Sequence, residues 1–209
     1  MSGTDQYRRI ASDPHWRPAG RYSAAILPAR QRYWLLDERS LTARLIGLNR
    51  GAFRVRRLSQ RWAVPHHSER RLLGMPARQR ALVREVGLML DAQTVVFARS
   101  VFPVTSLQGQ LAHLRQLRNK SLGSILFGHP GMHRSPFELA LIPGDSDYLP
   151  PSLRQAAPAW GRRSRFVIGG CGLLVSEVFL QAFVPWKPSG TARRSQRGKV
   201  DAAIGRPKQ

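Results

Sequence analysis

The sequence predicts an α+β domain, and three observations support this prediction. Two segments, 82–101 and 163–180, alternate apolar and polar residues around a polar or glycine-rich turn, as β-hairpins do. Short segments with helical spacing of apolar residues lie before the first hairpin and between the two. The chain has 209 residues, 42% of them hydrophobic, which is enough for one domain with a sizeable core.

Ahead of the first hairpin, the sequence predicts helical structure and a strand. Helical spacing runs over 34–48 and is reset at Ser40, a residue type typical of helix N-caps. Leu41 and Leu45 then fall on one side, which should cover one face of a sheet. The segment 53–58 alternates as a strand.

Two helical segments are expected between the hairpins. Residues 107–117 place leucines at helical spacing for the core. Residues 121–127 begin a short helix whose Leu122 can reach a pocket. Arg134 and Glu138, four residues apart, are most simply a local ion pair.

Arg84 and Arg99 of the first hairpin are the strongest pointers to chemistry. If the hairpin closes simply across the turn 91–94, Val86 faces Arg99, and both arginines share one mostly apolar face. Two guanidinium groups there are too costly to desolvate without anionic partners. They are therefore either paired within the protein as ordinary salt bridges or available to an anionic ligand.

Glu177 is the corresponding carboxylate on the second hairpin. Simple closure across 169–172 sets Ser164 opposite Glu177 and leaves this one carboxylate in an apolar row. Because burial perturbs the pKa of such a group, Glu177 is a candidate acid or base. The alternative is that it neutralises Arg84 or Arg99 and does nothing else.

Other polar residues point less clearly to function. Arg163 and Arg165 fall on the other face of the second hairpin, where a solvated role is expected. His66 and His67 suggest a metal site, but no third ligand is in register, so solvated histidines are favoured and no metal is expected. Cys171 is the only cysteine, which excludes an intramolecular disulfide and fits a reducing compartment.

The charge of the chain raises nucleic acid as a partner, since 34 Lys and Arg against 12 Asp and Glu give a formal net charge of +22. Part of this charge lies in 187–209, whose composition predicts a basic disordered tail. No helix-turn-helix, zinc finger or aromatic RNA-stacking motif is present, so only weak, non-specific adhesion at low salt is expected. Residues 1–30 are interpreted as an N-terminal extension that packs through Trp16, and 31–186 as the domain.

The sequence also predicts a cytoplasmic protein. The N-terminus has no apolar core of signal-peptide length. No later stretch approaches the ~18 uninterrupted apolar residues of a membrane-spanning helix.

Six blocks of sequence, in their order, spacing and identity, resemble the chorismate pyruvate-lyase family. No single block is specific, but together they are, and they extend from about Tyr33 to Leu180. The blocks are 33–45, 83–86, 98–104, 121–127, 160–166 and 177–180.

The resemblance implies a single antiparallel β-sheet with helices packed on it, enclosing a buried ligand chamber. It implies a lyase that converts chorismate to 4-hydroxybenzoate and pyruvate, the entry step of ubiquinone biosynthesis, without metal or organic cofactor. A monomer is expected. Carried onto this chain, the ligand-contacting positions are Leu41, Arg84, Leu122 and Glu177. Leu41 stands where the best-known member has methionine, a change that nearly conserves volume and should be tolerated.

The chemistry of chorismate, a dianion, suggests a role for each charged residue. Arg84 should hold the ring carboxylate, because a guanidinium matches a carboxylate bidentately. Arg99 is expected to meet the enolpyruvyl carboxylate or to help its ether oxygen leave. Glu177 should take the C4 proton or bond the C4 hydroxyl. The alternatives are a sensing domain of the same fold that binds without turnover, and another chorismate enzyme, a hydrolase or mutase.

Overall fold

The structure, a computed structural model, describes residues 13–23, 25–27, 29–49 and 51–183. Its centre is one antiparallel sheet of eight strands in the order β1-β6-β7-β8-β4-β3-β2, with β5 paired to β7 outside this path. This confirms the predicted α+β class with a single antiparallel sheet. The strands are β1 (Arg17–Pro18), β2 (Phe53–Ala63), β3 (Ala81–Leu90), β4 (Gln93–Pro103), β5 (Met132–Arg134), β6 (Glu138–Ile142), β7 (Ala159–Ile168) and β8 (Cys171–Phe179).

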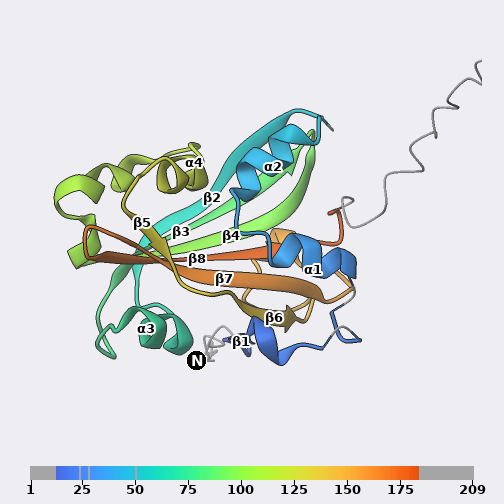
Figure 1. The fold of residues 1–209 in the computed structure, drawn as a ribbon, viewed down its shortest axis with the longest axis horizontal. Coiled ribbons are helices and arrows are strands. Elements are labelled where there is room, and N and C mark those ends of the chain that lie inside the picture. The colour runs from blue at the N-terminus through green and yellow to red at the C-terminus, as the bar shows by residue number, and fades with distance from the viewer. Residues whose placement is uncertain (1–12, 24, 28, 50, 184–209) are drawn as a thin grey trace, which may run out of the picture.

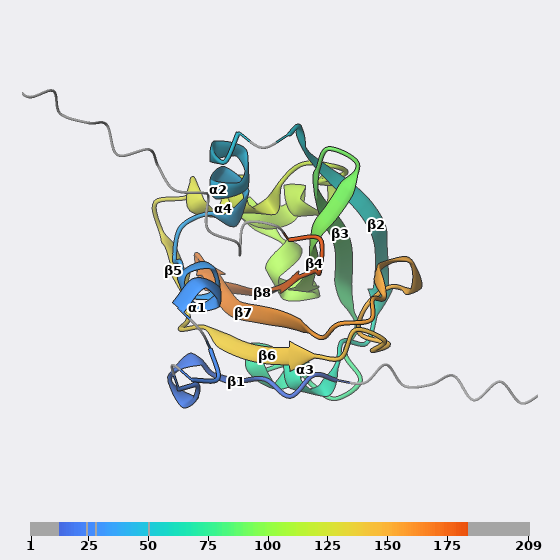
Figure 2. The same ribbon diagram turned by 90° about the vertical axis from the view of Figure 1, so that its right-hand side faces the viewer.

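The helices are short and lie on both sides of the sheet (Figure 1). Figure 2 shows the sheet curving so that α1, α2 and α4 lie on its concave side, while α3 lies outside, near β6. None of the helices in the described ranges is long and apolar enough to cross a membrane. The α-helices are α1 (Ala29–Leu35), α2 (Leu41–Gly47), α3 (His67–Leu73) and α4 (Leu122–Phe127); the 3₁₀ helices are η1 (Ala19–Arg21), η2 (Val104–Leu107), η3 (Gly109–Gln116) and η4 (Pro151–Leu153).

The β3–β4 hairpin differs from the predicted register by one residue, and this difference decides which side chains share a face. Leu90 pairs with Gln93 across a two-residue turn, and an extra residue at Val95 then forms a bulge, so that Leu88 pairs with Val96. A shift of one residue moves every following side chain to the other face. Arg84 therefore pairs with Ser100, and Arg99 pairs with Glu85. The prediction that Arg84 and Arg99 share a face is wrong.

The β7–β8 hairpin also closes more tightly than predicted, but by two residues, which preserves the faces. Ile168 pairs with Cys171 across Gly169 and Gly170, whose φ values of 54° and 78° suit glycine. The predicted apolar row on the Glu177 face is correct. The residue opposite Glu177, however, is Arg162 and not Ser164.

The helical segments follow the predicted pattern. The Ser40 side chain accepts a hydrogen bond from the Ala43 amide at the start of α2, and both Leu41 and Leu45 are buried on the concave side. The segment 107–117 forms mostly 3₁₀ helix, and its leucines are buried against β4 and β7.

Near the N-terminus, β1 joins the sheet by pairing with β6. Trp16 packs edge-on against Tyr148, with 6.2 Å between ring centroids. The boundaries predicted at 30/31 and 186/187 stay predictions, and the predicted basic tail, 187–209, lies outside the described residues.

Candidate functional site

A chamber lies on the concave face of the sheet. Strands β3, β4, β7 and β8 contribute its floor, and α2, α4 and β5 contribute its cover. It encloses about 570 Å³ of empty space, a figure that includes the part open to solvent. Leucine, valine and phenylalanine side chains make up half of the lining residues, and the charged lining residues are Arg84, Arg134, Arg162 and Glu177.

Arg84 enters this chamber from β3 as a buried cation without a carboxylate partner. Its side chain is 2% exposed, and its Nη2 donates to the carbonyls of Arg118 (3.0 Å) and Lys120 (2.9 Å). Its Nε is buried and unbonded, and none of the ion pairs in the described part of the chain involves it. Burial, reinforced by the nearby charge of Arg57, lowers the pKa of Arg84 to about 10. Arg84 therefore remains charged at neutral pH and is available to an anion.

Arg99 lies on the convex face and does not line the chamber. Its Nε donates to Glu69 Oε1 on α3 at 2.8 Å, and its Nη1 donates to Glu85 Oε1 at 2.5 Å. Two carboxylates thus neutralise Arg99 within the protein. The expected role of Arg99 at the substrate has no geometric basis, because the bulge at Val95 turns its side chain to the opposite face.

Glu177 enters the chamber from β8, where it is paired with Arg162 on β7. Arg162 Nε donates to Glu177 Oε2 at 2.6 Å. The partner of Glu177 is therefore neither Arg84 nor Arg99, as one alternative had supposed. Within the described residues, Glu177 Oε1 accepts no hydrogen bond, so one oxygen of this carboxylate, which lines the chamber, has no protein partner.

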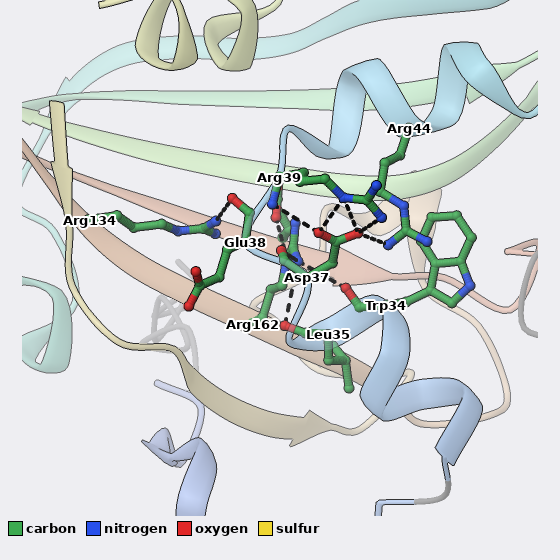
Figure 3. A network of polar contacts seen from close by, with 9 residues as sticks. Trp34, Leu35, Asp37, Glu38, Arg39, Arg44, Arg134 and Arg162 are labelled. Atoms are coloured by element: carbon green, nitrogen blue, oxygen red, sulfur yellow. Dashed lines mark hydrogen bonds and ion pairs between the residues drawn. The ribbon is translucent and has the colours of Figure 1, made fainter. Parts of the chain in front are cut away.

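Arg162 also anchors the segment between α1 and α2. Its Nη1 donates to the carbonyl oxygens of Trp34 (2.9 Å) and Asp37 (2.8 Å), as Figure 3 shows. Sequence reasoning missed Arg162 because the predicted strand began at 163, four residues after the start of β7 at Ala159. The available signal was its spacing: Arg162 precedes Phe166 by four residues in a strand and so shares its face.

Arg134 is a third arginine of the chamber and was also missed. The expected ion pair between Arg134 and Glu138 is wrong, because Glu138 instead accepts from Arg163 Nε at 2.7 Å. Figure 3 shows Arg134 reaching from β5 to the segment between α1 and α2, where its Nη1 donates to the Glu38 carbonyl at 3.1 Å. Strand β5 has only three residues, too few for an alternating pattern to be recognised.

Leu41 and Leu122 both line the chamber, from α2 and α4. Next to them, the hydroxyls of Thr42 and Ser121 lie 2.8 Å apart in a hydrogen bond that joins the two helices. The structure therefore brings four of the five predicted site residues, Leu41, Arg84, Leu122 and Glu177, to one chamber, and places Arg99 elsewhere.

Arg163 lies on the face of β7 that does not line the chamber. Arg163 is buried, bonded to Glu138 and to the Ser68 hydroxyl, so a solvated role for it is wrong.

His67 is exposed, whereas His66 is only partly exposed and its amide donates to Glu69 Oε2 at 2.9 Å. In the described ranges, no group of three or more His, Cys, Asp or Glu side chains is placed to hold a metal ion.

Comparison with known proteins identifies relatives along most of the chain. The family model described as chorismate lyase matches residues 11–187. A protein of Pseudomonas aeruginosa named "Probable chorismate pyruvate-lyase" is 42% identical over 159 residues, which cover 76% of this chain and 86% of that protein. One of the same name from Alcanivorax borkumensis is 39% identical over 181 residues, which cover 87% of this chain and 81% of that protein.

Among solved structures, the crystal structure of PhnF from Mycobacterium smegmatis resembles this chain with a TM-score of 0.51 at 12% identity. The match covers 70% of this chain and 65% of that one, and it shows a shared fold alone. The family match is of a different kind, because it spans most of the chain at the level of sequence. The chain belongs to the chorismate lyase family.

Proposed function

We propose that the protein is a lyase that converts chorismate to 4-hydroxybenzoate and pyruvate, as the first step of ubiquinone biosynthesis. One observation carries this proposal: the unpaired, buried cation of Arg84 and the anchored carboxylate of Glu177 line the same mostly apolar chamber. Membership of the chorismate lyase family supports the choice of substrate.

The chamber suits an aromatic carboxylic acid with a polar group on the opposite side of the ring. Arg84 and Glu177 lie on β3 and β8, which are separated by β4, so their backbones are roughly 10 Å apart across the sheet. A guanidinium binds a carboxylate bidentately, so Arg84 takes the ring carboxylate in this proposal. The side chains of Leu41 and Leu122 flank the ring.

The reaction breaks the bond between C3 and the ether oxygen and removes the proton from C4. The electron pair of the C4–H bond becomes the double bond between C3 and C4. The electron pair of the broken C3–O bond leaves on the ether oxygen as the enolate of pyruvate, which then takes up a proton. Because the product ring is aromatic, the reaction is steeply downhill and needs orientation and modest acid–base help rather than a nucleophile. Substrate bonds supply all the electrons, so the proposed mechanism uses neither a metal nor an organic cofactor.

Glu177 has one of two roles in this mechanism. Its unbonded Oε1 either accepts the hydrogen bond of the C4 hydroxyl or takes the C4 proton. In both cases the ion pair with Arg162 fixes the position of the carboxylate.

We also propose that the protein acts as a cytoplasmic monomer without a specific nucleic-acid partner. The single cysteine, Cys171, is compatible with a reducing compartment. Size-exclusion chromatography at physiological salt tests the monomer, and DNA retention that disappears as salt rises is the result expected for adhesion through charge alone.

Incubation of the purified protein with chorismate tests the proposed function. We expect 4-hydroxybenzoate and pyruvate in equal amounts, at a rate well above that of a heat-treated sample. Pyruvate with a non-aromatic diol would indicate a hydrolase, and a rearranged isomer of chorismate would indicate a mutase. Binding of chorismate without any product would indicate a sensing domain.

A further inference from the structure

The chamber holds two cations, the buried Arg84 and the half-buried Arg134, that the described part of the protein leaves without an ion-pair partner. Of its three arginines, Arg162 is neutralised by Glu177 at 2.6 Å. No carboxylate in the described part of the chain lies within ion-pair distance of Arg84 or Arg134. Cations that are removed from water without a partner are costly, so two of them on one chamber require an explanation.

We propose that Arg134 binds the enolpyruvyl carboxylate of chorismate, the second negative charge of the substrate. This inference rests on the proposed function, and it gives Arg134 the task that sequence analysis had assigned to Arg99. Two unpaired cations then meet the two carboxylates of the substrate, one each.

The surroundings of Arg134 fit a substrate contact. Its guanidinium carbon lies 4.0 Å from the ring centroid of Phe137 and 5.0 Å from that of Phe166, so aromatic rings hold the group in place. Its Nη1 is bonded to the Glu38 carbonyl, but its Nε is buried without a hydrogen-bond partner. A donor that is buried and unbonded in the free protein gains most when a ligand oxygen reaches it.

The chemistry of chorismate places its second carboxylate on the Arg134 side of the chamber. The enolpyruvyl group is attached at C3, next to C4, so it lies near whatever group binds the C4 hydroxyl. In the proposed orientation that group is Glu177. Arg134 and Glu177 both line the chamber. Burial lowers the pKa of Arg134 to about 10, and the charge of Glu177 is the one that most opposes this effect.

Arg134 in this position also favours the reaction itself. As the bond to C3 breaks, negative charge moves onto the ether oxygen and into the leaving enolate. A cation already fixed beside the enolpyruvyl group stabilises this charge without reorganisation. We therefore expect Arg134 to affect both the binding of chorismate and its turnover.

The product, 4-hydroxybenzoate, lacks the enolpyruvyl carboxylate, and this difference gives a sharp test. In Arg134→Met, which keeps an unbranched apolar stem, we expect kcat/KM for chorismate to fall about 10- to 100-fold. The Kd for 4-hydroxybenzoate should change less than about threefold, since Arg84 and Glu177 are retained. Arg134→Lys keeps the charge but loses the planar fork, so kcat/KM should fall only about 3- to 10-fold.

The matched control is Arg165→Met, which removes an arginine from β7 on the face that does not line the chamber. It should leave both quantities at parent values, and melting curves establish that each variant is folded. Equal losses of kcat/KM and of 4-hydroxybenzoate affinity in Arg134→Met would show that Arg134 only holds the Glu38 segment in place, and would overturn the proposal.

If Arg134→Met fails to fold, the Arg134→Lys variant provides the test instead. Parent values of kcat/KM in folded Arg134→Lys would overturn the proposal, and a loss confined to chorismate would support it. A parent protein that gives no 4-hydroxybenzoate from chorismate would instead refute the proposed function, an outcome that differs from a failure of Arg134 alone.

Discussion

Arg162 Nε donates a 2.6 Å hydrogen bond to Glu177 Oε2, and the same guanidinium donates to the backbone carbonyls of Trp34 and Asp37. One side chain on β7 thus positions the carboxylate of the chamber and the segment that leads into α2. Because Leu41 begins α2, the apolar cover and the polar end of the chamber depend on the same arginine.

Glu177→Gln is expected to lower turnover more than product affinity. The substitution keeps the size of the side chain and an oxygen for Arg162, but it removes the ionisable group. We expect kcat to fall on the order of 100-fold, while the Kd for 4-hydroxybenzoate rises less than about tenfold. Steady-state kinetics and calorimetric titration with 4-hydroxybenzoate measure the two effects. A parent kcat in this variant would leave Glu177 without a chemical role.

Arg84→Ala is expected to weaken the binding of substrate and product alike. The lost contact is a charge-assisted hydrogen bond to the ring carboxylate, which both molecules carry, and such bonds contribute about 1.5–3 kcal/mol. The Kd for 4-hydroxybenzoate should therefore rise about 10- to 150-fold. Unchanged product affinity in a folded Arg84→Ala variant would show that the carboxylate binds elsewhere in the chamber.

Arg99→Met is expected to reduce stability but not to change the chemistry. The substitution leaves the carboxylates of Glu69 and Glu85 buried on the convex face without their cation. Breaking a buried pair in this way typically costs about 3–5 kcal/mol. Urea unfolding should show this loss, while kcat/KM of the folded fraction, measured at low temperature, stays within about threefold of the parent. Full stability combined with lost activity would place Arg99 at the substrate after all.

Acidification is expected to destabilise the protein in part through His66. Burial, opposed by the charge of Glu69, holds the pKa of His66 below its ordinary value of 6.5. Below about pH 6.5 the unfolded chain therefore binds a proton that the folded chain does not, and the free energy of unfolding falls as pH drops.

In His66→Asn this contribution, at most about 1.4 kcal/mol at pH 5.5, should be absent. Asparagine is also a good N-cap residue for α3. Urea midpoints of both proteins at pH 7.5 and pH 5.5 provide the test, and equal pH dependence would exclude His66 as a source.

The two hairpins show that alternation in the sequence predicts the position of a hairpin more reliably than its register. Both were predicted in the right segments, and on the second hairpin the face that carries Glu177 is correct, since the register differs by an even number of residues. On the first hairpin a single extra residue at Val95 reverses the face of Arg99. Val95 and its neighbour Val96 are both buried valines, so no change in hydrophobicity marks the bulge in the sequence.

The length of the alternating pattern also explains which chamber residues could be predicted from the sequence. Alternation along β3 and β8 is enough to place Arg84 and Glu177 on their faces, and the family resemblance adds Leu41 and Leu122. Arg134 comes from a three-residue strand, where periodicity is too short to assign a face, and Arg162 lies within β7 but before the start of the predicted strand.

A crystal structure of the protein with bound 4-hydroxybenzoate tests the proposed roles of Arg84 and Glu177 together. We expect one molecule inside the chamber, with its carboxylate bound bidentately by Arg84 and its hydroxyl donating to Glu177 Oε1. The Arg162–Glu177 pair should stay intact, and Arg134 should lie beside the ring position next to the hydroxyl. A product molecule bound in the reverse orientation, or outside the chamber, would show that Arg84 and Glu177 do not have the proposed roles.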